Sequence, residues 1–142
     1  MTGAKYVGEI LLVEDNPGDV RLTKEMFKEV GFYGTYHVAT DGVEVLDFLY
    51  QRGNYVNVSL PDVIFLDWHF PKKSGKEVLT ELKNDENLKQ IPVVVLTATE
   101  PELNDLKSEN PRADAYVLKP FEPEDLIRIV EEFSLEQDIV QS

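Results

Sequence analysis

The sequence predicts a single α/β domain with an open parallel β-sheet covered by helices on both faces. Strand-like and helix-like patterns alternate along its 142 residues, which is typical of consecutive βαβ units. In addition, short apolar runs end on charged or hydroxyl side chains, namely Glu14 with Asp15, Asp67, Thr97 and Lys119. Because the carboxyl ends of parallel strands share one edge of the sheet, these side chains are expected to meet in one pocket.

Composition narrows the classes of partner. The chain has 27 acidic and 14 basic residues and a formal net charge of -13, without a segregated basic patch, so we expect neither a nucleic acid nor a membrane as partner. The absence of cysteine excludes a disulfide and a thiolate nucleophile and is compatible with a reducing cytoplasm. The first nine residues lack the apolar core of a signal peptide, and no apolar run approaches a membrane span in length. We therefore expect a cytoplasmic protein.

The first βα unit is predicted from an apolar run and the helix signals that follow it. Residues 9–13 form the expected strand. Asn16 and Pro17 then fit a helix cap followed by proline in the first turn. We expect the helix over residues 18–30, because Gly31 marks its stop.

The second unit leads into the centre of the sheet. Residues 36–39 predict a strand, and residues 42–51 predict a helix with apolar residues at helical spacing. Residues 53–61 are expected to form a loop. Residues 63–66 are apolar throughout, as expected for a central strand that helices cover on both sides.

The next helices differ in how much apolar surface they offer. A helix is predicted from Ser74, and residues 92–98 predict the fourth strand. The helix expected over residues 102–109 offers Leu103 and Leu106 for packing, so we expect it to be the least firmly anchored of the helices.

The last unit sets the expected domain boundaries. Residues 115–118 predict the fifth strand, and a final helix with apolar residues at helical spacing is predicted from Pro123. The chain is thus divided into an N-terminal tail (1–8), the folded domain (9–134) and residues 135–142. This last segment is interpreted as a tail or as an extension of the final helix.

Several motifs occur in an order that resembles a known family. They are VEDNPGD (13–19), ATDGVEVLDFL (39–49), PDVIFLDWHFPKKSGKEVL (61–79), IPVVVLTAT (91–99) and YVLKPF (116–121). Over residues 9–133 the chain is similar to receiver domains of response regulators in bacterial and archaeal two-component signalling. Among these it most resembles single-domain regulators associated with phytochrome-type sensor kinases. The resemblance implies a flavodoxin-like, doubly wound sheet of five parallel strands in the order 2-1-3-4-5.

The acidic residues of the predicted pocket favour a metal ion. Glu14, Asp15 and Asp67 would repel one another if all were ionised in one cleft, which would raise at least one pKa. Bound Mg²⁺ would let all of them stay charged. The resemblance implies that Asp15 and Asp67 bind Mg²⁺ directly and that Glu14 binds through water. It implies that the backbone carbonyl of His69 is the further protein ligand.

The resemblance also implies roles in phosphoryl transfer, which needs positioned groups and neutralised charge more than covalent work. Asp67 matches the family's phosphoacceptor, a nucleophilic carboxylate. Lys119 would pair with one phosphoryl oxygen, and the hydroxyl of Thr97 would donate to another. Tyr116 matches the switch aromatic that turns inward when the threonine moves. The Lys119–Pro120 peptide matches a bond that is usually cis in this family.

These residues favour a signalling function that is not enzymatic. The expected phosphodonor is a sensor histidine kinase or a histidine phosphotransfer protein, and the expected output is a downstream protein partner or a homodimer. A phosphorylation-independent binding module is an alternative, although such proteins typically lose the acceptor, an acid or the lysine. A phosphatase with an aspartyl nucleophile is a weaker alternative, because the haloacid-dehalogenase type needs a second acid where this chain has His69.

Overall fold

The protein is described by a computed structural model that covers residues 5–68, 75–108, 110–119, 122–133 and 137–138. Its strands are β1 (Lys5–Val13), β2 (Phe32–Ala39), β3 (Val63–Asp67), β4 (Val93–Thr97), β5 (Ala115–Leu118) and β6 (Gln137–Asp138). Its helices are α1 (Pro17–Glu29), α2 (Gly42–Leu49), the 3₁₀ helix η1 (Gly53–Tyr55), α3 (Gly75–Asn84), α4 (Glu100–Ser108) and α5 (Pro123–Glu132).

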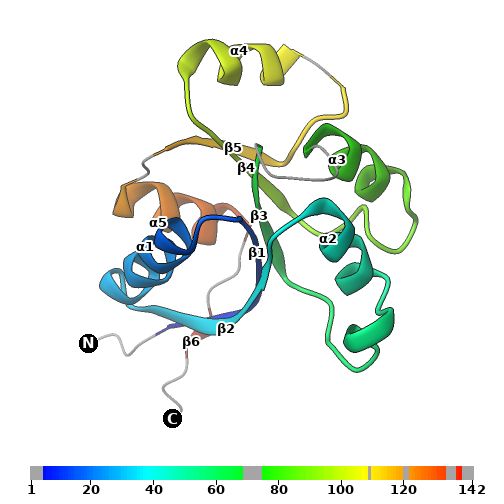
Figure 1. The fold of residues 1–142 in the computed structure, drawn as a ribbon. Coiled ribbons are helices and arrows are strands. Elements are labelled where there is room, and N and C mark those ends of the chain that lie inside the picture. Colours follow the sequence, from blue (N-terminus) through cyan, green and yellow to red (C-terminus); the bar gives the residue numbers. More distant parts are fainter. Residues whose placement is uncertain (1–4, 69–74, 109, 120–121, 134–136, 139–142) are drawn as a thin grey trace.

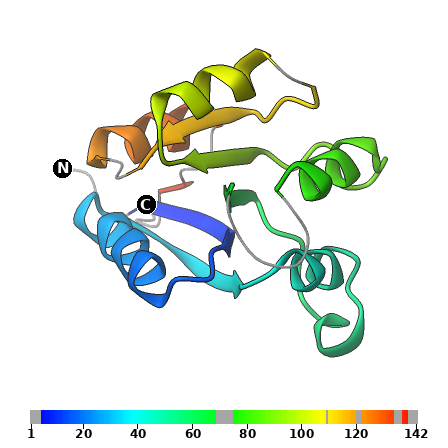
Figure 2. The same cartoon turned by 45° about the horizontal axis from the view of Figure 1, so that its top comes forward.

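The strands β2-β1-β3-β4-β5 lie side by side in that order, and each adjacent pair is parallel. Helices α1 and α5 lie on one side of the sheet, and α2 and α3 lie on the other (Figure 1). Turning the molecule shows α4 beside β4 and β5 (Figure 2). The predicted doubly wound sheet and its strand order are therefore confirmed.

The sheet separates two hydrophobic clusters, and the central strands contribute to both. Every residue of β3 and of β4 is buried. Ile64 and Leu66 pack with α2 and α3, whereas Phe65 packs with α1 and α5. The ring of Phe27 on α1 meets Phe65 edge-on, with 5.7 Å between their centroids. This packing fixes the strands whose carboxyl ends form the site.

The first strand begins at Lys5, earlier than the predicted residue 9. A bulge lies between Tyr6 and Gly8, and Gly8 has φ of +103°. A Cβ atom on Gly8 would overlap the Asp62 carboxylate, which accepts a hydrogen bond of 2.8 Å from the backbone N–H of Glu9. Residues 5–8, expected to be part of a tail, therefore belong to the sheet.

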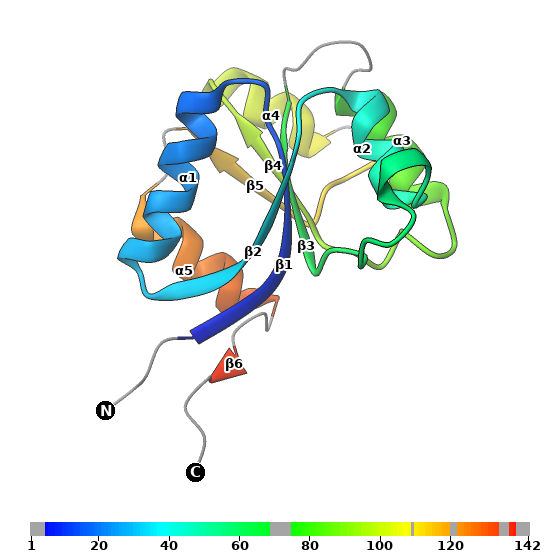
Figure 3. The same ribbon diagram turned by 60° about the horizontal axis from the view of Figure 1, so that its bottom comes forward.

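The second strand also starts earlier than predicted, at Phe32, and pairs along β1. At the C-terminal end, α5 finishes at Glu132, and the two-residue β6 pairs antiparallel with the start of β1 (Figure 3). Gln137 and Asp138 thus lie in a strand and not in the helix extension that was one of the two expectations. Within the described residues, no helix combines the length and apolar character needed to span a bilayer.

The segment after α2 was expected to be a loop, and it contains the short helix η1. Hydrogen bonds hold η1 against α2. The hydroxyl of Tyr55 donates to Glu44 at 2.6 Å, and the backbone N–H of Thr40 donates to the same carboxylate at 2.7 Å. Burial alone would raise the pKa of Glu44, but these hydrogen bonds hold the pKa below its ordinary value. Ionised Glu44 therefore connects η1 to the start of α2.

Candidate functional site

The side chains expected to meet do lie at neighbouring strand ends. Glu14 follows β1, Asp67 ends β3, Thr97 ends β4 and Lys119 follows β5. Backbone hydrogen bonds continue past the strand ends, since the N–H of Glu14 donates to Ala39 and that of Lys119 to Thr97. Glu14, Asp67 and Thr97 are buried, whereas Lys119 is partly buried.

The ammonium of Lys119 joins the carboxylates at this edge. Its Nζ atom lies 2.9 Å from Oδ2 of Asp67, 3.3 Å from Oε1 of Glu14 and 3.3 Å from Oδ2 of Asp19. Lys119 is partly buried, so these charges attract one another more strongly than they would in water. The predicted meeting of Glu14, Asp67 and Lys119 is thus confirmed as geometry.

The crowded charges shift the pKa values of both Glu14 and Lys119. Burial, followed by the hydrogen bond and charge of Asp67, raises the pKa of Glu14 to about 7. Burial alone would lower the pKa of Lys119, but the hydrogen bond and charge of Asp67 and the charge of Glu14 raise it above its ordinary value. Negative charge therefore exceeds what the ammonium neutralises, and a cation or a proton is favoured here.

The acidic cluster differs from the expected one at one position. Among the described residues, Glu14, Asp19 and Asp67 are the acids whose ligand atoms all lie within 4.8 Å of one another. Asp15 is exposed and stands outside this cluster. Its direct binding of a metal stays a prediction, for which its side chain would have to turn inward.

Asp19 was not predicted as a site residue, although the sequence held a signal for it. Asn16 caps α1, and its side chain accepts hydrogen bonds from the backbone N–H groups of Gly18 and Asp19. Asp19 therefore lies in the first turn of the helix that follows β1, where the helix dipole favours a carboxylate.

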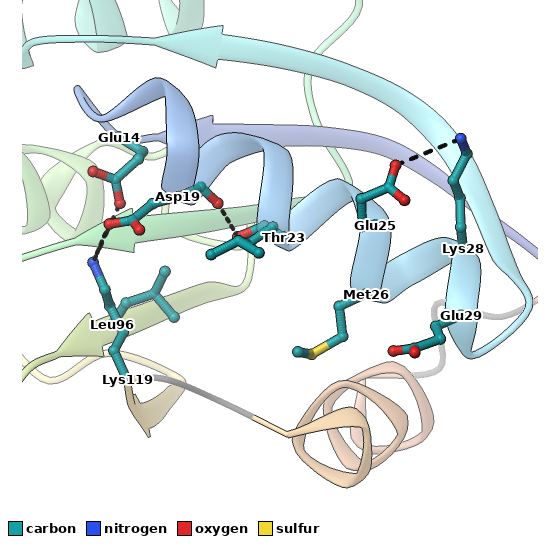
Figure 4. A pocket seen from close by; sticks show the side chains of 10 residues that line it. Glu14, Asp19, Thr23, Glu25, Met26, Lys28, Glu29, Leu96 and Lys119 are labelled. Atoms are coloured by element: carbon teal, nitrogen blue, oxygen red, sulfur yellow. Dashed lines mark hydrogen bonds and ion pairs between the residues drawn. The ribbon is translucent and has the colours of Figure 1, made fainter.

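A groove extends from the cluster along α1 (Figure 4). Its volume is about 830 Å³. Glu14, Asp19 and Lys119 lie at one end, while Met26 and the exposed Leu22 of α1 line its length. The charged site is thus open to a partner that approaches along this helix.

The hydroxyl of Thr97 is already hydrogen bonded. It donates to the carboxylate of Glu102, which lies in the first turn of α4 and is partly buried. Sequence analysis did not single out Glu102.

Tyr116 is partly buried and packs against the cluster formed with α2 and α3. Its hydroxyl accepts from the backbone N–H of Ala113 at 2.9 Å and donates to the backbone carbonyl of Leu106 in α4 at 3.4 Å. Both side chains predicted to act in switching therefore contact α4.

Two predicted features lie outside the described residues. These are the backbone carbonyl of His69 and the Lys119–Pro120 peptide, because His69 and Pro120 fall in gaps of the description. Trp68, next to the proposed phosphoacceptor, is partly exposed, and its backbone N–H donates to Leu96 at 3.0 Å.

Comparison with known proteins identifies the family. A family model described as the response regulator receiver domain matches residues 10–131. The chain belongs to this family. The response regulator Rcp1 of Synechocystis is 40% identical to this receiver domain over 122 residues, which cover 86% of the chain and 83% of Rcp1.

Solved structures agree with this assignment. The Mn²⁺-bound form of Rcp1 has a TM-score of 0.74 at 37% identity, with 94% of this chain and 99% of that chain covered. The phosphorylated cyanobacterial phytochrome response regulator RcpA has a TM-score of 0.73 at 38% identity, covering 93% and 92%. The receiver domain of Pseudomonas aeruginosa PA1611, with a magnesium ion in its active-site cleft, has a TM-score of 0.66 at 29% identity, covering 88% and 95%. The predicted similarity to phytochrome-associated response regulators is confirmed.

Proposed function

We propose that this receiver domain accepts a phosphoryl group on Asp67 from a sensor histidine kinase or a histidine phosphotransfer protein and signals through phosphorylation-dependent protein interaction. The observation that carries the proposal is the contact of 2.9 Å between Asp67 and Lys119 at the buried end of β3, with Glu14 beside them. A cytoplasmic location is part of this proposal.

The carboxylate of Asp67 would act as the nucleophile. An oxygen of Asp67 attacks phosphorus of the donor phosphohistidine, the P–N bond breaks, and its electron pair stays on the imidazole nitrogen, which takes up a proton. The product is an acyl phosphate on Asp67. Lys119 carries three N–H donors and can keep one on Asp67 while it donates another to a phosphoryl oxygen.

The residues present fit a magnesium ion. Mg²⁺ takes oxygen ligands and commonly binds one or two carboxylates, and the acids of the cluster offer oxygens within 4.8 Å of one another. Glu14, Asp19 and Asp67 could hold it, as could Asp15 once turned inward. When bound, the ion neutralises charge on the carboxylates and on the transferred group.

The output would pass through α4 and β5, because Thr97 and Tyr116 both contact α4. We propose that a downstream protein or a second copy of the chain recognises this surface after phosphorylation. The homologue Rcp1, a response regulator by name, supports a signalling output over an enzymatic one.

Intact-mass measurement tests the phosphoacceptor. The protein is incubated with Mg²⁺ and a small acyl-phosphate donor, beside Asp67→Asn and a control, Asp105→Asn, which replaces an exposed acid on α4. We expect one phosphoryl adduct on wild type and on Asp105→Asn and none on Asp67→Asn.

The same measurement with a phosphorylated histidine phosphotransfer protein as donor tests the source of the phosphoryl group. An adduct that persists on Asp67→Asn would place the acceptor elsewhere. No adduct on folded wild-type protein with either donor would overturn the proposed function and favour a phosphorylation-independent binding module.

A further inference from the structure

The hydroxyl of Thr97 has two competing acceptors in the proposed cycle. In the structure its hydrogen goes to Glu102, while the proposed phosphorylated state needs the same hydrogen for a phosphoryl oxygen. A threonine hydroxyl has one hydrogen to donate, so the two bonds cannot form together. Thr97 is 1% exposed, and no bulk water is available to replace whichever acceptor is lost.

The position of Glu102 is set by the start of α4. The backbone N–H of Glu102 donates to the hydroxyl of Thr99 at 3.3 Å, and the N–H of Leu103 donates to the carbonyl of Thr99 at 3.0 Å. Thr99 precedes α4 and Glu102 follows three residues later, which is the T-x-x-E pattern of a helix start. The first turn of α4 therefore brings the Glu102 carboxylate to the end of β4.

Helix α4 has little other anchorage to the sheet. All of its residues are described, and Leu106 is the side chain among them that is buried. The hydroxyl of Tyr116 adds a hydrogen bond to the carbonyl of Leu106 near the far end of the helix. The Thr97–Glu102 bond is thus a polar contact between the first turn of α4 and the strand end that carries Thr97.

Charge makes the competition one-sided after phosphorylation. A phosphoryl group adds a charge of about −1.5 to −2 near neutral pH and offers strong acceptor oxygens. These oxygens would attract the Thr97 hydroxyl and repel the Glu102 carboxylate, which lies within hydrogen-bond reach of the same hydroxyl.

We infer that Glu102 is a positioning residue that holds Thr97 and the first turn of α4 in the unphosphorylated arrangement, and that phosphorylation of Asp67 releases this turn by taking the Thr97 hydroxyl from Glu102. The inference rests on the proposed function. By linkage, a partner that binds α4 in its released arrangement favours phosphorylation by the same factor.

Titration with beryllofluoride in the presence of Mg²⁺ measures this competition, with the fluorescence of Trp68 as readout. Glu102→Ala removes the competing acceptor. We expect this variant to bind beryllofluoride about tenfold more tightly than wild type, because a hydrogen bond to a charged group no longer has to be broken on binding. Glu102→Gln keeps a neutral acceptor and should fall between the two. Glu100→Gln changes an exposed acid of the same turn and should match wild type within about twofold.

A double-mutant cycle separates competition from a merely structural role. In a Thr97→Val background the contested hydrogen is absent, so Glu102→Ala should gain only the relief of charge repulsion, which is a clearly smaller increase in beryllofluoride affinity than in the presence of Thr97. Hydrogen exchange gives a second readout. Backbone amides of α4 should exchange faster in Glu102→Ala without beryllofluoride, and in wild type once beryllofluoride is bound.

The outcomes distinguish the inference from the function on which it rests. Wild-type protein that neither responds to beryllofluoride nor forms the adduct on Asp67 would overturn the proposed function. A wild type that responds, with Glu102→Ala and Glu100→Gln binding equally well, would overturn the role of Glu102. A lower melting temperature of Glu102→Ala without tighter binding would also overturn it, since helix stabilisation alone would then explain the contact.

Discussion

Replacement of Glu14 by glutamine should remove a pH dependence of stability that the acidic cluster creates. Glu14 is 9% exposed and lies beside Asp67, and its pKa rises from the ordinary 4.5 to about 7 because of burial and the neighbouring carboxylate. The folded state therefore binds more protons than the unfolded state between these values. The contribution of protonated Glu14 to the free energy of unfolding is fully present below pH 4.5 and is lost as the pH rises through about 7.

The magnitude follows from the size of the rise. At about 1.4 kcal/mol per pH unit, a pKa raised from 4.5 to about 7 corresponds to about 3 kcal/mol in total. Most of this is lost between pH 5 and pH 8. Glu14→Gln keeps the shape of the side chain without its charge, so the variant should be more stable than wild type by about 3 kcal/mol at pH 8.

Urea unfolding of metal-free protein across this pH range measures the effect. The control Glu29→Gln replaces an exposed acid of α1 and should keep the wild-type slope. Saturating Mg²⁺ should flatten the wild-type curve, because a bound cation favours the ionised carboxylate. A Glu14→Gln curve that still falls as steeply as wild type would show that another group carries the pH dependence and would refute the reasoning.

Other predictions concern the packing around the site and the connection of η1. Gly75→Ala would place a Cβ atom 2.8 Å from Cε3 of Trp68 and 3.0 Å from the backbone oxygen of Trp68. We therefore expect a changed tryptophan emission and a free energy of unfolding in urea that is lower by about 1–3 kcal/mol. An unchanged emission spectrum would contradict this close approach. Tyr55→Phe removes a hydrogen bond of 2.6 Å to Glu44 and should cost about 1 kcal/mol at neutral pH. Because the pKa of Glu44 is lowered in the folded state, this stabilisation should disappear as the pH falls, and a constant cost in acid would argue against the bond.

The fold was largely predictable because its signals are local. Apolar runs such as residues 63–66 predict buried strands, and Asn16 with Pro17 predicts the start of α1. The ends of the sheet were not predictable to the same degree. Gly8 lies within β1 because its missing side chain leaves room for the Asp62 carboxylate, and a two-residue strand such as β6 is too short to show a pattern.

Sequence by itself determined which chemistry gathers at the site, because the carboxyl ends of parallel strands share an edge wherever their residues lie in the chain. That rule was enough to bring Glu14, Asp67 and Lys119 together. Tertiary structure decided which acids complete the arrangement. Asp19 joins the cluster while Asp15 is exposed, and Glu102 reaches Thr97 because α4 begins two residues earlier than predicted. Such directions depend on where helices start and on what they pack against, and spacing along the chain does not record them.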